Sequence, residues 1–289
     1  MRTYLQDQLT ALHLSLAEQR ELIFERRSAD SFSDIELNGD EQEHILNFLD
    51  GCDLPFASQD LHIDWISEET LHNLFFNQSK KVVSCPQYLL FRLVPDDHSL
   101  YNLGAVIQQL ALWLHARGYS GRLQSQFNTG LDSMDTASDY AIASEGQTTR
   151  FEEAQPLLLP LVMAIGTPDQ DQKSRPAPVL MKRFVTGAQD KLDPIHYQLM
   201  TAALAAPTER RELPWHFVLE GRRIHLYMRQ SLRLNKYQRL LMRKVGVGCL
   251  LANVMFSASL LQRELQITIR TQAEARRKME YVCTLTPLK

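Results

Sequence analysis

Two arginines and a serine stand side by side near the start of the 289-residue chain, at Arg26, Arg27 and Ser28. Guanidinium groups form paired, charge-assisted hydrogen bonds with phosphate oxygens, and a neighbouring hydroxyl adds a further donor. This run could therefore hold the phosphate group of a ligand. The alternative is that an arginine pair at the end of a helix faces solvent or interacts with the helix dipole.

A second segment, APTERRELPW, lies late in the chain at residues 206–215. Together with ERRSADSF at residues 25–32, it resembles the nitroreductase family of flavoproteins. In that family an Arg-Arg-Ser run precedes a phenylalanine four residues later. The later segment keeps the family's order of alanine, proline, a hydroxyl residue, proline and tryptophan.

The resemblance implies an FMN cofactor held between the two segments. It implies that the early run binds the FMN phosphate together with a later basic pair, and that an Asn-x-x-Lys pair contacts the flavin ring and ribityl chain. The proline segment would lie against the flavin, with Trp215 packed in the core beneath it. The residues assigned to FMN in this way are Arg26, Arg27, Ser28, Asn77, Lys80, Lys173, Arg175, Pro207, Thr208 and Arg211.

Three positions depart from the family pattern. Asp30 stands where the family has a lysine or arginine near the N1/O2 edge of the flavin, and a carboxylate there opposes the charge of a reduced flavin. Arg211 replaces an asparagine and Leu213 replaces a glutamine. Arg211 could restore the missing positive charge. These departures favour an alternative in which the protein sequesters flavin or binds a partner without turnover.

In the family, the two segments that meet at one flavin come from different subunits of a homodimer. Their presence in one chain implies an α+β protein built as an intramolecular pseudo-dimer of two degenerate repeats, residues 1–176 and 177–289. Residues 102–106 open the first long helix, and residues 245–249 lie at the matching place in the second. Residues 54–65 and 181–189 lack the proline-tryptophan and Arg-Arg-Ser patterns, so we expect one FMN per chain and a monomer.

Periodicity of apolar residues predicts the elements that position these residues. The expected helices span 3–25, 40–50, 100–117 and 237–261, and a further helix starts at Asp193-Pro194. The expected strands span 87–94, 159–166, 265–269 and 280–286, with two more in 215–228 around Glu220-Gly221. Residues 128–155, rich in acidic and small residues, are expected to form a surface excursion.

Composition narrows the class of function. A net charge of −3 gives no electrostatic reason to expect nucleic acid. The cysteines are scattered and fit a reducing cytoplasm, and residues 245–261 fall short of a membrane span and predict a buried helix. No metal-binding motif and no catalytic side chain is identified. The resemblance therefore implies hydride transfer from NAD(P)H through flavin N5 to a small acceptor.

Overall fold

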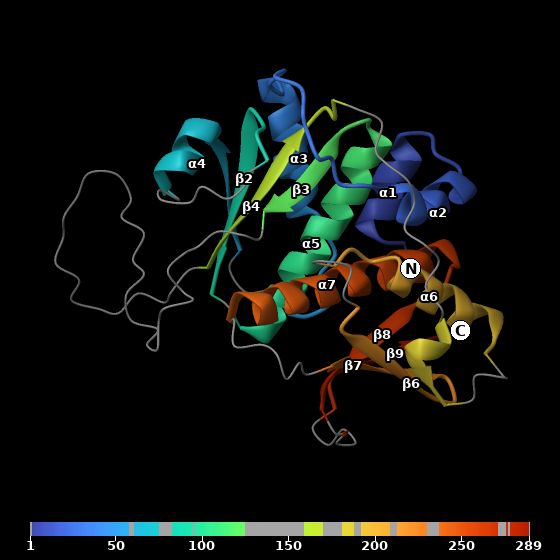
Figure 1. Ribbon diagram of the computed structural model, residues 1–289. Coiled ribbons are helices and arrows are strands. Elements are labelled where there is room, and N and C mark those ends of the chain that lie inside the picture. The colour runs from blue at the N-terminus through green and yellow to red at the C-terminus, as the bar shows by residue number, and fades with distance from the viewer. Residues whose placement is uncertain are drawn as a thin grey trace.

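The computed structural model describes residues 2–57, 61–74, 83–94, 96–124, 159–169, 181–187, 192–208, 213–229, 237–270, 276 and 278–288. Two β-sheets lie at opposite ends of the molecule, and two long helices, α5 (Asp97–Ala116) and α7 (Tyr237–Leu260), cross between them (Figure 1). The α+β class predicted from the sequence is therefore confirmed.

The first sheet has the strand order β1-β2-β4-β3 and is antiparallel throughout. Its strands are β1 (His62–Ser67), β2 (Gln87–Leu93), β3 (Ser120–Gln124) and β4 (Leu159–Gly166). The second sheet has the order β5-β6-β7-β9-β8. Its strands are β5 (Val185–Thr186), β6 (Trp215–Glu220), β7 (Arg223–Arg229), β8 (Leu265–Thr268) and β9 (Met279–Pro287).

The two sheets share one connectivity. Each sheet begins with an antiparallel pair of strands, which is followed by a long helix and then by two more strands. The second of these two strands lies beside the pair, and the first forms the edge of the sheet. A short helix precedes each unit, α3 (Gly39–Asp50) in the first and α6 (Pro194–Leu204) in the second. β5 follows the first unit in sequence, yet it adds in parallel to the edge of the second sheet through β6.

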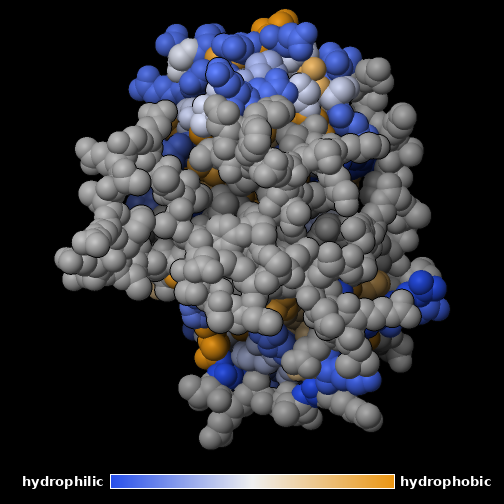
Figure 2. Space-filling view, turned by 60° about the vertical axis from the view of Figure 1, so that its left-hand side comes forward, coloured by the Kyte–Doolittle hydropathy of each residue, from blue (hydrophilic) through white to orange (hydrophobic). Residues whose placement is uncertain are grey.

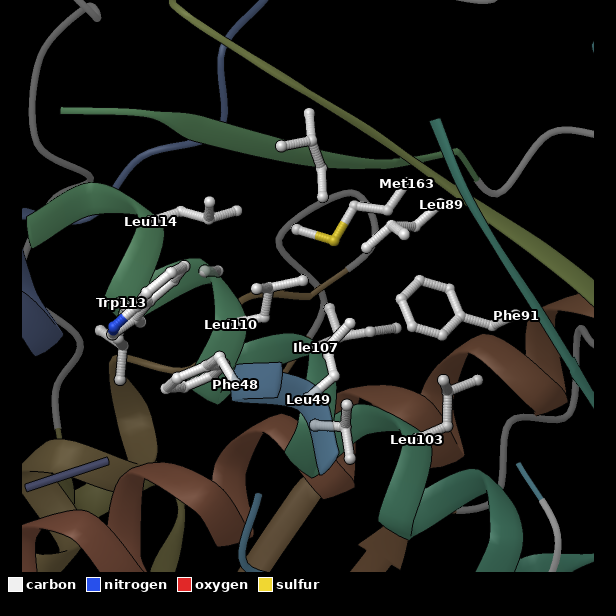
Figure 3. Close-up of a cluster of buried hydrophobic side chains, with 14 of the residues drawn as sticks. Phe48, Leu49, Leu89, Phe91, Leu103, Ile107, Leu110, Trp113, Leu114 and Met163 are labelled. Carbon is white, nitrogen blue, oxygen red and sulfur yellow. The ribbon is translucent and has the colours of Figure 1, made fainter. Parts of the chain in front are cut away.

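The inner face of the first sheet packs on α5 and on α3 (Figure 3). Figure 3 shows Leu89, Phe91 and Met163 pointing from the strands toward Leu103, Ile107 and Leu110 of α5. Phe48 of α3 stacks on Trp113 with ring centres 4.7 Å apart. The outer face carries a separate apolar cluster that includes Tyr88 and Leu90, and Leu71 of α4 (Glu68–Leu74) and Phe32 cover it.

The single helix expected over residues 3–25 is wrong, because the chain breaks into α1 (Tyr4–Ala11) and α2 (Leu16–Glu25). His13 takes a φ of 62°, and Ser15 and Glu18 form a reciprocal capping box that starts α2. The Ser-x-x-Glu spacing at 15–18 is the signal that could have predicted this break.

The other predicted elements are confirmed within a few residues, including the start at Asp193, whose side chain accepts a hydrogen bond from the His196 amide. The sequence analysis missed β1, α4, β3, β5 and the 3-10 turn η2 (Met181–Arg183). The acidic segment 128–155 lies outside the described residues. One helix among those described, Leu240–Leu260, is long and apolar enough to cross a membrane, but 78% of its apolar window is buried inside the protein.

Candidate functional site

Arg26 ends α2 and turns its guanidinium toward Ser28. Its Nη1 donates a hydrogen bond to Ser28 Oγ at 3.3 Å. The Arg26 side chain is half-buried and Ser28 is exposed. α2 packs against both α5 and α7, so this arginine is placed where the two long helices meet the N-terminal segment.

Arg27 has a different role. Its Nη1 donates to the carbonyl oxygens of Phe24 at 2.7 Å and of Arg26 at 2.8 Å. Basic side chains near a helix C-terminus satisfy carbonyls that have no partner within the helix. One of the two arginines thus caps α2, as the helix-end alternative expects, and Arg26 remains available for an anion.

The groups around Arg26 come from three elements. Burial lowers the pKa of Arg26, and the charge of Arg27 lowers it further. Burial also lowers the pKa of His115 in the last turn of α5, with Arg26 adding to the effect and Glu25 opposing it. In α7, burial raises the pKa of Cys249 to about 12 although the Arg26 charge acts the other way.

Arg26 forms no ion pair with any carboxylate in the part of the chain that the structure describes. A half-buried cation that, among the described residues, has a hydroxyl as its hydrogen-bond partner and no carboxylate is incompletely neutralised, because burial weakens its hydration. A phosphate dianion would supply the missing charge. The residues present therefore fit a phosphate-bearing group at this point.

Asp30 does not stand as an isolated charge. Its carboxylate forms an ion pair with Arg122 of β3, and Arg122 Nη1 also donates to the Ala29 carbonyl at 3.1 Å. Ser120 of the same strand accepts a hydrogen bond from the Ala29 amide at 3.0 Å. The opposing charge expected from Asp30 is thus offset by an arginine that the sequence analysis did not identify.

Pro207 and Thr208, here called the proline wall, follow α6 and lie against α7 at Gly246. A Cβ atom built on Gly246 would lie 3.8 Å from the Pro207 carbonyl oxygen and 3.9 Å from Thr208 Cγ2. The Trp215 ring lies 3.8 Å from the same point and is fully buried, so its predicted core position is confirmed.

The two distant segments therefore meet on one helix. α2 packs against α7, where the Arg26 charge opposes the rise in the pKa of Cys249, and the proline wall lies beside Gly246, three residues before Cys249. Residues three apart share a helix face and are separated by about 4.5 Å along the axis. Five further assigned residues, Asn77, Lys80, Lys173, Arg175 and Arg211, lie outside the described residues.

On α5, the position that corresponds to Gly246 of α7 carries a side chain, that of Asn102. Gly104 and Gly248 face each other where α5 and α7 cross, and each also faces a carbonyl of the other helix, that of Val245 and that of Tyr101. This pairing relates residues 101 and 104 to residues 245 and 248, an offset of 144, and so relates Asn102 to Gly246.

Asn102 closes this second place with its side chain. Its Oδ1 accepts from the Phe56 amide at 3.2 Å, and its Nδ2 donates to the Phe56 carbonyl at 3.2 Å. The Phe56 ring stacks on His98 with centres 4.7 Å apart. Where α7 has an open glycine at Gly246, α5 has an amide, Asn102, that is bonded to the facing loop.

Three groups at this site escaped the sequence analysis. Arg122 lies on an unpredicted strand, and His115 and Cys249 carried no local signal because only the packing of α2 on the long helices brings Arg26 to them. Of the two glycines at 246 and 248, Gly248 packs against α5, whereas Gly246 faces the proline wall.

Comparisons with known proteins match the chain to one family model and to several solved structures. A family model described as "Putative TM nitroreductase" matches residues 18–258. The structure of a Thermotoga maritima protein described as a "putative nitroreductase" is similar over 95% of this chain and 94% of that one, with a TM-score of 0.59 and 16% identity. None of the curated proteins compared with the chain matches it.

Two further structures are less similar. An FMN-dependent nitroreductase from Clostridium difficile is 16% identical, with a TM-score of 0.42 over 58% of this chain and 98% of that one. A nitroreductase with bound FMN from Desulfitobacterium hafniense is 12% identical, with a TM-score of 0.41 over 62% of this chain and 98% of that one.

Proposed function

The chain belongs to the family described as "Putative TM nitroreductase", whose model spans most of its length, and we propose that it is an FMN-dependent oxidoreductase. In this proposal NAD(P)H is the reductant and a small molecule such as a nitroaromatic or quinone is the acceptor. Bound FMN would supply the chemistry, by accepting a hydride at N5 and passing electrons on.

One observation carries the proposal. The second helix, which ends just before Arg26, packs against α7, and the proline wall, about 180 residues later in the chain, lies beside Gly246 of the same helix. The family resemblance requires these two segments to share one ligand. Arg26 and Ser28 would bind the phosphate, and the proline wall would hold the flavin from the opposite side.

Arg122 supports turnover over simple storage of flavin. Its ion pair with Asp30 reduces the negative potential that an unpaired carboxylate would place beside the cofactor. A reduced flavin carries negative charge, so this pairing removes one obstacle to hydride transfer.

The alternative, a protein that sequesters flavin or binds a partner without turnover, is favoured by Leu213. This side chain packs against the apolar core of the second repeat, at the position where the family has a glutamine. No amide is then presented to the ligand from this position. Leu213 affects the rate of reaction more than the binding of flavin, because it is not among the residues that would bind the phosphate.

We also propose that the chain is an internally duplicated pseudo-dimer with one FMN. The two units have the same strand order and the same long-helix position, and α5 and α7 contact each other through matched glycines. The place equivalent to the proline wall site is closed by Asn102 and Phe56. The repeats would end and begin near residue 176.

The first experiment is to measure flavin released by denaturation of purified protein, against protein concentration. We expect a ratio near one. A ratio near two would contradict the closed second site, and failure to bind added FMN would contradict the whole site. Oxidation of NADPH or NADH with a nitroaromatic or quinone then separates the enzyme from the flavin store.

A further inference from the structure

Gln124, the last residue of β3, carries a buried amide whose hydrogen bonds are incomplete. Only 7% of this residue is exposed to solvent. Its Oε1 accepts a hydrogen bond from the Val83 amide at 3.5 Å, whereas its Nε2 has no partner among the described residues. Because a backbone N–H can only donate, the atom that faces Val83 is the oxygen, and the nitrogen is the donor without a partner.

A buried donor of this kind is exceptional for the molecule. In Figure 2 the described surface at the upper end, where Figure 1 shows α3 and the first sheet, is largely hydrophilic, so polar side chains there mostly face water. Burying an amide N–H without an acceptor costs free energy, and buried polar groups in native proteins are almost always paired with protein, water or a ligand. The Nε2 atom of Gln124 therefore calls for an acceptor.

The side chain of Gln124 belongs to a row of polar groups on one face of β3. Ser120, Arg122 and Gln124 alternate along the strand, so their side chains point to the same face of the sheet. Leu123, between them, packs against the core on the opposite face. The row is thus on the side of the sheet that α5 does not cover.

This row begins beside the proposed phosphate site and leads away from it. Ser120 Oγ donates to the Arg27 carbonyl at 3.3 Å, between Arg26 and Ser28 in the chain. Gln124 lies four residues further along β3, about 13 Å away by strand geometry. A ligand that has its phosphate at Arg26 and Ser28 and extends along this row presents its other end to Gln124.

The neighbour that orients Gln124 is itself fixed in place. Tyr88 Oη donates to the Val83 carbonyl at 3.0 Å and accepts from the Cys85 amide at 2.9 Å. Cys85 Sγ donates to the Ile165 carbonyl of β4 at 3.1 Å. Since Val83 is held by the first sheet, the direction of the Gln124 amide is set before any ligand binds, which favours a binding role.

We infer that Gln124 binds the flavin ring, by donating a hydrogen bond from Nε2 to a carbonyl oxygen of its pyrimidine part. This inference rests on the proposed function. FMN carries its phosphate at one end and a ring with two carbonyl oxygens at the other, so it supplies the acceptor that Nε2 lacks. A donor at a flavin carbonyl also stabilises the negative charge of the reduced ring.

The test compares two substitutions at Gln124 with a matched control, on the full chain. Gln124→Glu keeps an oxygen for the Val83 amide and removes the donor, whereas Gln124→Leu removes both. Gln42→Glu makes the same change on α3, where Gln42 Nε2 already donates to the Leu37 carbonyl at 3.0 Å. The probes are FMN and riboflavin, which share the ring and differ by the phosphate, with binding measured by fluorescence titration at pH 8.

We expect Gln124→Leu to weaken FMN and riboflavin alike, by about three- to tenfold, as for the loss of one neutral hydrogen bond. Gln124→Glu should weaken both at least as much, because a carboxylate then faces the carbonyl oxygen. Gln42→Glu should change either affinity less than twofold. A loss in Gln124→Leu alone would assign Gln124 to holding Val83, and a loss for FMN alone would assign it to the phosphate. Either result would overturn the inference.

Infrared spectra of bound FMN, labelled with ¹³C at C2 or at C4, provide the second measurement. A hydrogen bond lowers the stretching frequency of the carbonyl that accepts it, so one of the two bands should move to higher frequency in Gln124→Leu. The two proposals fail in different ways. A protein that binds neither flavin loses both. A protein that binds FMN, with bands and affinities unchanged in both Gln124 variants, keeps the oxidoreductase assignment and loses the role of Gln124.

Discussion

Gly104 of α5 and Gly248 of α7 contact each other directly, and neither has room for a side chain. A Cβ built on Gly104 would lie 1.9 Å from the Val245 carbonyl oxygen, and one built on Gly248 would lie 2.0 Å from the Tyr101 carbonyl oxygen. The contact is reciprocal, as expected where two related helices cross at a local twofold axis. It sets how closely α5 and α7 approach each other.

Replacing Gly248 with alanine should therefore lower the free energy of unfolding. The added methyl group meets backbone, which cannot yield as a flexible side chain can, and overpacking of this kind costs about 1–3 kcal/mol. Urea unfolding measures the change. Gly246→Ala is the matched control, because its Cβ would meet nothing closer than 3.8 Å and alanine favours helix by about 1 kcal/mol. Equal stability of the two variants would contradict the close crossing.

A second prediction concerns the phosphate grip. Arg26→Ala should weaken FMN by about 10- to 150-fold, since a charge-assisted hydrogen bond is worth ~1.5–3 kcal/mol. Riboflavin, which lacks the phosphate, should lose much less. Fluorescence titration measures both. Arg27→Ala serves as the control, and we expect it to destabilise the end of α2 with a smaller effect on FMN. Equal losses for FMN and riboflavin would make Arg26 structural.

Much of this arrangement could be predicted from the sequence, because long helices and buried strands have strong periodicity. The start of α6 followed from Asp193 and Pro194, and α7 followed from its apolar run. Arg122 could not be predicted, since its pairing with Asp30 joins residues 92 apart through a short strand. From the sequence, the loss of a second flavin site was predicted only because residues 54–65 lack the proline-tryptophan pattern. The hydrogen bonds between Asn102 and Phe56 supply a physical basis for that loss.

The pair of Asp30 and Arg122 gives a third prediction. Arg122→Ala should lower kcat/KM by about two- to fivefold, because an exposed ion pair is worth ~0.2–1 kcal/mol. Asp30→Asn removes the charge that Arg122 offsets, so the double variant should recover most of the loss. Steady-state assays with NADPH and a quinone measure all four proteins. Additive effects in the double variant would show that Arg122 acts independently of Asp30 and would contradict the proposed charge offset.

His115 makes stability depend on pH. Burial and Arg26 lower its pKa below the ordinary 6.5, so the folded protein resists a proton that the unfolded chain accepts. The stabilising effect of a neutral His115 is complete above pH 6.5 and is lost as the pH falls below that value. As the pH falls from 8 to 5, we therefore expect the unchanged protein to lose more free energy of unfolding than His115→Gln does. Urea unfolding of both proteins measures this difference. A difference independent of pH would contradict the depressed pKa.

The last prediction is that one chain alone holds the cofactor. If the chain is the pseudo-dimer that we propose, the contact between α5 and α7 replaces the subunit interface at which the nitroreductase resemblance places the flavin. Both helices are largely buried by that contact and by their own sheets, as their apolar sequences predict. Sedimentation at several protein concentrations, followed by flavin absorbance, should show a monomer that carries FMN. The proposed duplication fails if flavin sediments only with a dimer, or if residues 1–176 and 177–289 each form a stable soluble domain when expressed separately.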